Sequence, residues 1–305
     1  VMLGDPTISA QVLIDRLPSE IEKALILDQA SAVRAIHSFI MDAAQYSERR
    51  LPRNFDFGQP QIEALVTLYL LSHIQPSLKP LVLDVLRKTP LSALIFRAVR
   101  RIFKAAEAFD DADAFGCLAQ VMENTKGTYN SDYFKWVPEQ KRKQIGDKSQ
   151  LAWSTKTRSY FRRRTWRQLR RLGSIADPSY VPMAVGLLVE IDGADTAHQL
   201  SYAGQKVIFG AGERYRWSGT LGLSLARGAS TSADTDISTS REEPFPELWD
   251  QAPETVFGLL KLAQSELVRC FAIRILQDSP DFCASISIET ITELLAHKSQ
   301  AVRAF

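Results

Sequence analysis

The chain has 305 residues, of which 45% are hydrophobic and 24% are charged, and its formal net charge is +2. That length suits one large or two ordinary domains, and that composition is typical of a globular soluble protein. The longest apolar run, Ala64–Leu71, is much shorter than the roughly 18 residues of a membrane span, which excludes a transmembrane segment and predicts no membrane partner.

The N-terminus and the cysteines bear on the cellular compartment. The opening sequence, V-M-L-G-D-P, has neither the basic region nor the apolar region of a signal peptide. The three cysteines, Cys117, Cys270 and Cys283, are odd in number and widely spaced, which argues against a disulfide framework. We therefore expect reduced thiols in a cytoplasmic protein, whose oligomeric state stays open.

The N-terminal part of the chain is predicted to consist of helices joined by short turns. Pro18, Pro60, Pro80 and Pro90 each stand next to a segment with helical spacing of apolar residues, and Pro178 precedes a further one. The predicted helices span residues 20–27, 31–41, 61–74, 81–87, 91–109, 112–123 and 181–191.

The charge is distributed very unevenly along the chain. Residues 141–172 contain twelve bases and one acid, a net charge of +11, so the remainder carries −9 against a total of +2. Six of these bases are arginines within ten residues, from Arg162 to Arg171. An asymmetry of this size bears on binding partners, and net charge alone conceals it.

Residues 154–172 predict an amphipathic helix with a broad basic face. On a helical wheel of about 100° per residue, one side of this helix is apolar and consists of Phe161, Thr165, Leu169 and Leu172. Ser154 and Gly173 suit its ends as the N-cap and C′ residues. Arg162 lies beside the apolar side, so we expect it to be a snorkelling or ion-paired structural residue.

The opposite, basic arc contains the candidate polyanion-binding residues. Like charges at i,i+4 repel by a few tenths of a kcal/mol per pair, so something must offset the repulsion. Three sources remain open: an internal ladder of ion pairs between helices, a nucleic acid or other polyanion, and an acidic protein surface. Guanidinium groups match phosphates bidentately, and Tyr160 lies where it could stack on a base or on a neighbouring guanidinium. The candidate binding residues are Lys156, Tyr160, Arg163, Arg164, Arg167, Arg170 and Arg171, and the carboxylates available for an internal ladder are those of Asp110, Asp111, Asp113, Glu242 and Glu243.

Residues 194–251 differ in composition from the predicted helices. Residues 205–217, Q-K-V-I-F-G-A-G-E-R-Y-R-W, have the content of a strand, a glycine turn and a second strand, which predicts a small β-hairpin. Residues 227–243 are rich in Ser, Thr and Asp, which predicts a flexible loop. We therefore expect an inserted hairpin and loop over 193–250, between helical regions at 1–192 and 251–305.

The last 55 residues contain an internal repeat. The stretch L-L-K-L-A-Q-S-E-L-V-R-C-F, residues 259–271, aligns with L-L-A-H-K-S-Q-A-V-R-A-F, residues 294–305, with one gap. A looser copy spans residues 25–39. A leucine-rich helix, a polar turn and a second helix that opens with V-R form a helical hairpin, and recurrence at a fixed period predicts stacking. A spacing of 34 residues relates the matched pairs Ser265/Ser299, Val268/Val302, Arg269/Arg303 and Phe271/Phe305.

This repeat resembles the HEAT repeats, an α-solenoid family in which a turn followed by V-R opens the second helix of each pair. The resemblance is specific over residues 259–305, loose over 25–39 and diffuse across the other helices of the first 190 residues. It implies an all-α fold of stacked helical hairpins, interrupted by the insertion at 194–251, and a binding scaffold; it does not imply catalysis. It also implies a structural role for Arg34, Arg269 and Arg303. Because the chain stops at A-V-R-A-F, we expect a fragment of a larger multidomain protein.

No pattern in the chain predicts a catalytic, cofactor or metal site. The four histidines share no ligand spacing, and F-G-A-G at 209–212 lacks the third glycine of a dinucleotide-binding motif. Asp110, Asp111 and Asp113 lie between two predicted helices, where helix capping explains them. The favoured function is an α-solenoid scaffold whose arginine-rich helix contacts a polyanion, above all nucleic acid. The alternatives are a protein-interaction scaffold and, without any matching residue, an enzyme of the helical-repeat DNA glycosylase type.

Overall fold

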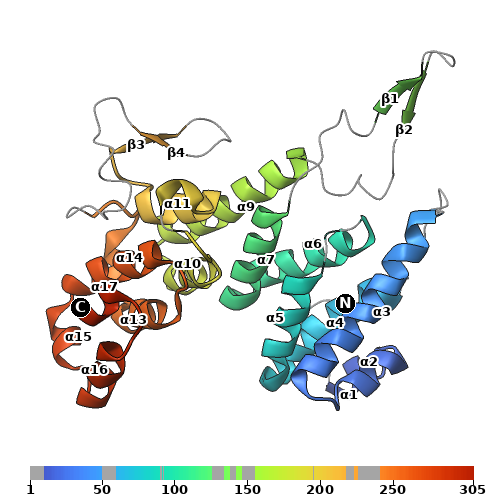
Figure 1. The fold of residues 1–305 in the computed structure, drawn as a ribbon, viewed down its shortest axis with the longest axis horizontal. Helices are drawn as coiled ribbons and strands as arrows, with labels where there is room; N and C mark the ends of the chain where they lie inside the picture. The colour runs from blue at the N-terminus through green and yellow to red at the C-terminus, as the bar shows by residue number, and fades with distance from the viewer. Residues whose placement is uncertain are drawn as a thin grey trace. The chain divides into compact units, whose positions relative to one another are not determined.

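The computed structural model describes residues 10–49, 60–89, 91, 93–125, 134–137, 142–145, 155–194, 196–217, 223–225 and 241–305. These residues are mostly helical and include two antiparallel ribbons of two strands each (Figure 1), which confirms the predicted all-α class. The chain divides into two compact units, unit 1 with Val1–Ala108 and Thr125–Arg158, and unit 2 with Phe109–Asn124 and Ser159–Phe305. These boundaries do not coincide with those of the three regions predicted from the sequence.

Unit 1 is a group of helices around α4 (Pro60–Ile74). This helix contains the longest apolar run of the chain, and five of its side chains between Ala64 and Leu71 are at most 1% exposed. A helix that is apolar on all sides belongs at the centre of a core, and α4 contacts helices α1, α3, α5 and α6. The other elements of unit 1 are α1 (Ala10–Ile14), α2 (Ser19–Ala24), α3 (Gln29–Arg49), η1 (Pro76–Leu78), α5 (Lys79–Lys88), α6 (Ala93–Ala108), β1 (Phe134–Val137) and β2 (Arg142–Ile145).

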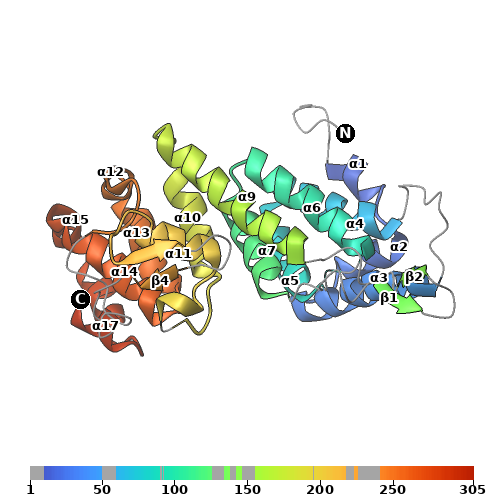
Figure 2. The ribbon, with the colours of Figure 1, turned by 90° about the horizontal axis from the view of Figure 1, so that it is seen from above.

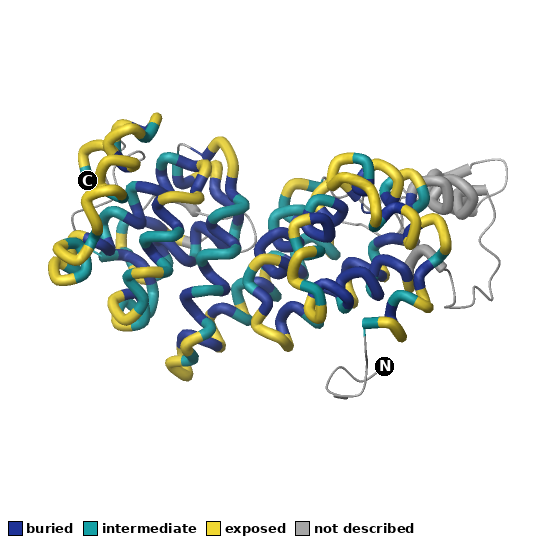
Figure 3. Tube along the Cα trace, turned by 90° about the horizontal axis from the view of Figure 1, so that it is seen from below, coloured by how far each residue is buried: buried dark blue, intermediate teal, exposed yellow. Residues whose placement is uncertain are grey.

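Unit 2 is organised around the crossing of α7 (Ala112–Asn124) and α10 (Tyr180–Val189). A Cβ atom on Gly116 would lie 2.0 Å from the carbonyl oxygen of Gly186, so the two backbones approach more closely than any side chain allows. In each unit the buried residues lie on the helix sides that face other helices (Figure 3). The other elements of unit 2 are η4 (Ala197–Gln199), α11 (Tyr202–Phe209), β3 (Tyr215–Trp217), β4 (Leu223–Leu225), α12 (Pro246–Asp250), α13 (Pro253–Leu262), α14 (Glu266–Gln277), α15 (Pro280–Ala284), α16 (Ile288–Leu295), α17 (Gln300–Ala304) and α9 (Thr155–Ser174), whose first four residues belong to unit 1.

The two C-terminal copies of the repeat form two pairs of helices. Helix α13 packs against α14, α16 packs against α17, and α14 also contacts α17. The hydroxyl of Ser265 accepts a hydrogen bond from the Val268 N–H, and the hydroxyl of Ser299 accepts one from the Val302 N–H, both at 3.3 Å. The matched serines are therefore N-caps of equivalent helices, which explains why serine recurs at this point of the repeat.

Glu266 connects these two pairs of helices. One carboxylate oxygen accepts a hydrogen bond of 2.7 Å from the Ser299 hydroxyl, and the other accepts one of 2.9 Å from the Arg269 guanidinium. Burial raises the pKa of the Glu266 carboxyl, but these hydrogen bonds outweigh burial and hold the pKa below its usual value. Arg269 thus has a structural contact, and so has Arg303, which donates to the carbonyl groups of His297 and Lys298.

In the looser copy at 25–39, the serine does not lie at the same position relative to the start of its helix. The carboxylate of Asp28 accepts a hydrogen bond of 3.1 Å from the Ser31 N–H at the start of α3. Ser31 is therefore a residue of the first helical turn, whereas Ser265 and Ser299 precede their helices. Arg34 donates to the Ser31 hydroxyl at 2.9 Å, a local contact within the same helix.

The predicted hairpin over 205–217 is wrong in its first half. Residues 205–209 belong to α11, whose N-cap Ser201 accepts a hydrogen bond of 3.1 Å from the Gly204 N–H. The cap and the burial of this helix against α10 override the strand propensity of its β-branched and aromatic residues. The ribbon instead joins β3 to β4, in the register Tyr215 to Leu225 and Trp217 to Leu223.

The predicted flexible loop over 227–243 is wrong at its C-terminal end. Glu242 and Glu243 are buried and form ion pairs with Arg214 and Arg241, respectively. Arg241 also pairs with Asp250 at 2.8 Å. Residues 227–240 lie outside the described residues, and β1 and β2 form a ribbon that the sequence did not predict.

The crossing of α7 and α10 predicts a strong effect of a single methyl group. We expect Gly116→Ala to lower the free energy of unfolding by about 1–3 kcal/mol, because the new Cβ atom meets backbone that cannot move aside. Gly258→Ala in α13 is the matched control: its Cβ atom would meet nothing within 4 Å, so it should stabilise by about 0.5–1 kcal/mol. Urea unfolding followed by circular dichroism measures both, and a Gly116→Ala variant as stable as the unaltered protein would contradict the close crossing.

Candidate polyanion-binding surface

The inner face of α9 matches the predicted apolar stripe. The residues of this stripe, Phe161, Thr165, Leu169 and Leu172, are at most 4% exposed. The Thr165 hydroxyl donates a hydrogen bond of 3.0 Å to the Phe161 carbonyl oxygen. Periodic burial of this kind fixes the rotation of the helix about its axis. The side that faces away from the core of unit 2 is therefore the side that carries the arginines.

The C-terminal turn of α9 is held by a contact that the sequence did not predict. Gly173 was expected at the C′ position, but it lies inside the helix, and a Cβ atom there would come within 2.2 Å of the Phe245 ring. Phe245 itself has a left-handed backbone conformation, with φ at 59°. Its ring meets the Tyr180 ring edge-on, with the two ring centres 5.2 Å apart. Glycine at 173 is needed because the Phe245 ring occupies the space of a side chain.

The outer face of α9 is almost wholly cationic. Its exposed residues are Lys156, Arg163, Arg167, Arg170, Arg171 and Ser174, and every one before Ser174 is a base. Four of them, Arg163, Arg167, Arg170 and Arg171, lie in unit 2, and we call them the arginine surface. Lys156 lies on the first turn of the helix, in unit 1.

The arginine surface is not neutralised by carboxylates from the described part of the chain. Among the described residues, no Asp or Glu forms an ion pair with Lys156 or with any of the four arginines. Arg167 Nε donates to the Arg163 carbonyl oxygen and Arg171 Nε to the Gln168 side-chain oxygen, both at 3.3 Å. These bonds leave the positive charge of both guanidinium groups unpaired.

Four of the five carboxylates considered for an internal ladder have partners elsewhere. Asp110 accepts a hydrogen bond of 3.0 Å from the Ser179 hydroxyl, and Asp111 caps α7 by accepting from the Ala114 N–H at 3.2 Å. The predicted capping role in this acidic cluster is therefore confirmed. Glu242 and Glu243 are taken by Arg214 and Arg241, and Asp113 is exposed on the first turn of α7.

Tyr160 and Arg164 lie beside the arginine surface and interact with it. The Arg164 guanidinium donates to the Tyr160 hydroxyl at 3.1 Å, and the Arg167 guanidinium carbon lies 5.8 Å from the centre of the Tyr160 ring. Both residues are half-buried. Tyr160 therefore supports guanidinium groups of its own helix, which is one of the two roles proposed for it from the sequence.

Arg162 differs from its neighbours in having a carboxylate partner. Its guanidinium forms a two-point ion pair with Glu123 of α7, in which Nε lies 2.8 Å from one carboxylate oxygen. The side chains of Arg162 and Glu123 are only 25% and 12% exposed. The structural role expected for Arg162 is therefore confirmed.

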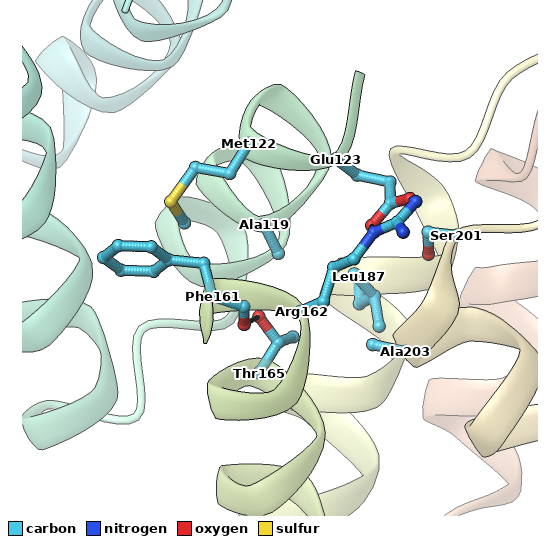
Figure 4. Close-up of a pocket in the computed structure, with 9 residues that line it drawn as sticks. All are labelled: Ala119, Met122, Glu123, Phe161, Arg162, Thr165, Leu187, Ser201 and Ala203. Atoms are coloured by element: carbon cyan, nitrogen blue, oxygen red, sulfur yellow. Dashed lines mark hydrogen bonds and ion pairs between the residues drawn. The ribbon is translucent and has the colours of Figure 1, made fainter. Parts of the chain in front are cut away.

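The ion pair of Arg162 lines a small cavity between α7, α9, α10 and the start of α11 (Figure 4). Phe161 and Met122 lie on one side of it, and Glu123 and Ser201 on the other (Figure 4). Its volume is about 10 Å³, which admits about one water molecule. The cavity is too small for a cofactor or a substrate.

The described residues contain no second kind of site. No group of three or more His, Cys, Asp or Glu side chains among them is placed to hold a metal ion, and none of the three cysteines, all of them described, forms a disulfide. Phe209 ends α11 and Gly210 is its C-cap, so F-G-A-G does not follow a strand as a dinucleotide-binding motif would. Across the residues that the structure describes, no helix is both long enough and apolar enough to cross a membrane.

Comparison with known proteins found no matching family model, no similar curated protein and no similar solved structure.

Arg162, which has a carboxylate partner, and Arg163, which has none among the described residues, should contribute differently to the free energy of unfolding. We expect Arg162→Leu to lower the free energy of unfolding by about 1–2 kcal/mol, because it removes the two-point ion pair that the guanidinium forms with the half-buried Glu123 carboxylate. Arg163→Leu, at the next position, should change it by at most about 0.5 kcal/mol. Urea unfolding of both variants, and of each combined with Glu123→Gln, gives the coupling energy. Equal losses for Arg162→Leu and Arg163→Leu would show that the ion pair contributes nothing.

Proposed function

We propose that this protein is a helical scaffold that binds nucleic acid through the arginine surface of α9, mainly by contacts to phosphate groups. The observation that carries the proposal is the set of four exposed guanidinium groups on one helix, without a carboxylate partner among the described residues. Their mutual repulsion costs a few tenths of a kcal/mol per i,i+4 pair, and bound phosphates would offset that cost.

The spacing of the arginines fits a phosphate backbone. With about 1.5 Å of rise and 100° of turn per residue, Arg163, Arg167 and Arg170 lie within an arc of about 60° and along about 10 Å of helix. Each strand of DNA carries one charge per about 3.4 Å of duplex axis, so this row faces about three phosphates. Guanidinium forks bind phosphate oxygens bidentately, and Arg171 extends the row at its C-terminal end.

The aromatic residues of α9 favour phosphate contact over base stacking. No aromatic side chain in the described part of this helix is exposed: Phe161 is buried, and Tyr160 and Trp166 are half-buried. One face of the Tyr160 ring is occupied by Arg167 of the same helix. Binding should therefore depend on charge and salt concentration rather than on base sequence.

We further propose that the helix pairs α13–α14 and α16–α17 are HEAT-like units of an α-solenoid. Three features support this assignment: the equivalent serine caps, the 34-residue spacing and the contact between α14 and α17. The three cysteines form no disulfide with one another, which fits the cytoplasmic location that we propose with it.

An acidic protein is the second candidate partner. Carboxylates also match guanidinium forks, and α16 exposes apolar side chains of the kind found in protein interfaces, with Ile288 at 75% and Leu295 at 60% exposed. Under this alternative the helical units would be a protein-interaction scaffold. Capture of an acidic protein that survives nuclease treatment, with no binding of nucleic acid at moderate salt, would favour it.

The proposal predicts a steep and local dependence on charge. We expect the triple variant Arg163→Gln, Arg167→Gln and Arg170→Gln to bind a mixed-sequence DNA duplex about ten- to a hundredfold more weakly, because it loses about three phosphate contacts. The slope of log affinity against log salt should fall by about 0.9 per lost contact. Fluorescence anisotropy between about 50 and 200 mM salt measures both quantities.

The matched control removes three exposed bases elsewhere, with Arg16→Gln, Lys23→Gln and Lys298→Gln. This variant has the same net charge as the α9 variant but keeps the arginine surface. It should therefore retain most of the affinity and most of the salt slope of the unaltered protein. If both triple variants bind equally well, the arginine surface is not the binding site.

A further inference from the structure

A second helix presents a cationic face of similar size to that of α9. In α6, the exposed charged residues are Arg97, Arg100, Arg101 and Lys104, and the one acid of the helix, Glu107, is buried. The opposite face of α6 contains Ile95, Ile102 and Phe103, which are fully buried, and packs against α4 within unit 1 (Figure 2).

Three of these bases have no partner within the described chain. Among the described residues, no carboxylate forms an ion pair with Arg100, Arg101 or Lys104, and their side chains make no hydrogen bond. Other exposed bases do find acids: Arg87 pairs with Asp84 at 3.0 Å and Lys261 pairs with Glu293 at 3.2 Å. Single exposed bases without an ion pair among the described residues, such as Arg16 and Lys23, also occur, so what distinguishes α6 is the grouping of three such bases on one side of a helix.

The geometry of the α6 face resembles that of the arginine surface. At about 1.5 Å and 100° per residue, residues 97 to 104 cover about 10 Å of helix and an arc of about 100°. Residues 163 to 171 cover about 12 Å and the same arc. The bases of α6 recur at i, i+3, i+4 and i+7, and those of the arginine surface recur at i, i+4, i+7 and i+8. Both spacings place the charges in a row along one side of a helix.

We propose that Arg100, Arg101 and Lys104 form a second phosphate-binding surface, so that the protein contacts the backbone of nucleic acid through one helix in each unit. That the ligand is nucleic acid rests on the proposed function of α9. That α6 presents a binding surface is inferred from its own bases, which have no ion pair among the described residues. Two surfaces on separate units would increase the number of neutralised phosphates and therefore the salt dependence of binding.

The test is the triple variant Arg100→Gln, Arg101→Gln and Lys104→Gln, compared with the α9 variant and with the matched control variant on the same DNA duplex. We expect its affinity to fall about ten- to a hundredfold and its salt slope to fall by about three, one for each lost phosphate contact. The variant Arg100→Lys with Arg101→Lys keeps the charge and should keep most of the affinity and all of the salt slope. It therefore separates loss of charge from disturbance of the helix, and circular dichroism of each variant checks the fold.

Each outcome decides the inference. A weaker α6 variant with a smaller salt slope, beside an unchanged control variant, supports it, whatever the α9 variant shows. If the α6 variant binds like the unaltered protein while the α9 variant is impaired, the inference is overturned and the proposed function of α9 stands. If neither variant differs from the unaltered protein, both are overturned. If the Lys variant loses as much affinity as the Gln variant, charge is not the cause and the inference fails.

Discussion

The close approach of α7 and α10 is the constraint on which the outward face of α9 depends. Gly116 and Gly186 allow the two backbones to touch, and this places Glu123, near the C-terminal end of α7, where it meets Arg162. The pair of Arg162 and Glu123 and the buried stripe from Phe161 to Leu172 then fix how α9 is rotated. Since Arg162 is held toward the core, the four arginines of the arginine surface are left on the other side of the helix.

The distribution of acids makes this arrangement electrostatically distinct. The chain has almost as many acids as bases, so an arginine-rich helix could have been neutralised internally. Instead, Glu242 and Glu243 are buried in ion pairs with Arg214 and Arg241, and Asp111 caps a helix. Buried carboxylates need partners because desolvation of an unpaired charge is costly. These acids are therefore committed to the fold and cannot reach the arginine surface.

Much of α9 could be predicted from the sequence because its pattern is local. The 3.6-residue period gave the buried stripe, and the position of Arg162 beside that stripe indicated its structural role. The serine caps of α14 and α17 could be inferred in the same way, since capping involves residues only three positions apart. The all-α class follows from such signals, while the stacking of the helix pairs as a solenoid stays a proposal.

Other features depend on contacts that are distant in the sequence. Residues 205–209 have strand propensity, but the Ser201 cap and packing against α10 make them helical. Nothing near Glu242 in the chain indicates that it is buried in an ion pair, because its partner Arg214 lies 28 residues earlier. The basic face of α6 did have a local signal, an acid-free stretch at 91–106 with bases at i, i+3, i+4 and i+7. Four bases among apolar residues are a weaker signal than six arginines within ten residues, so the sequence alone does not predict a binding surface on α6.

The contact between Phe245 and Gly173 has a consequence for the thermodynamics of recognition. The Phe245 ring packs against Gly173 in the last turn of α9, and the Tyr180 ring packs against the Phe245 ring. These contacts hold the turn that carries Arg170 and Arg171 in place without a ligand. The loss of backbone conformational entropy when a flexible segment becomes ordered costs about 1–2 kcal/mol per residue. Because the backbone of α9 is already fixed, this cost does not reduce the affinity of the helix for a ligand. In the proposed complex with nucleic acid, the conformational entropy lost by α9 would be that of a few long side chains.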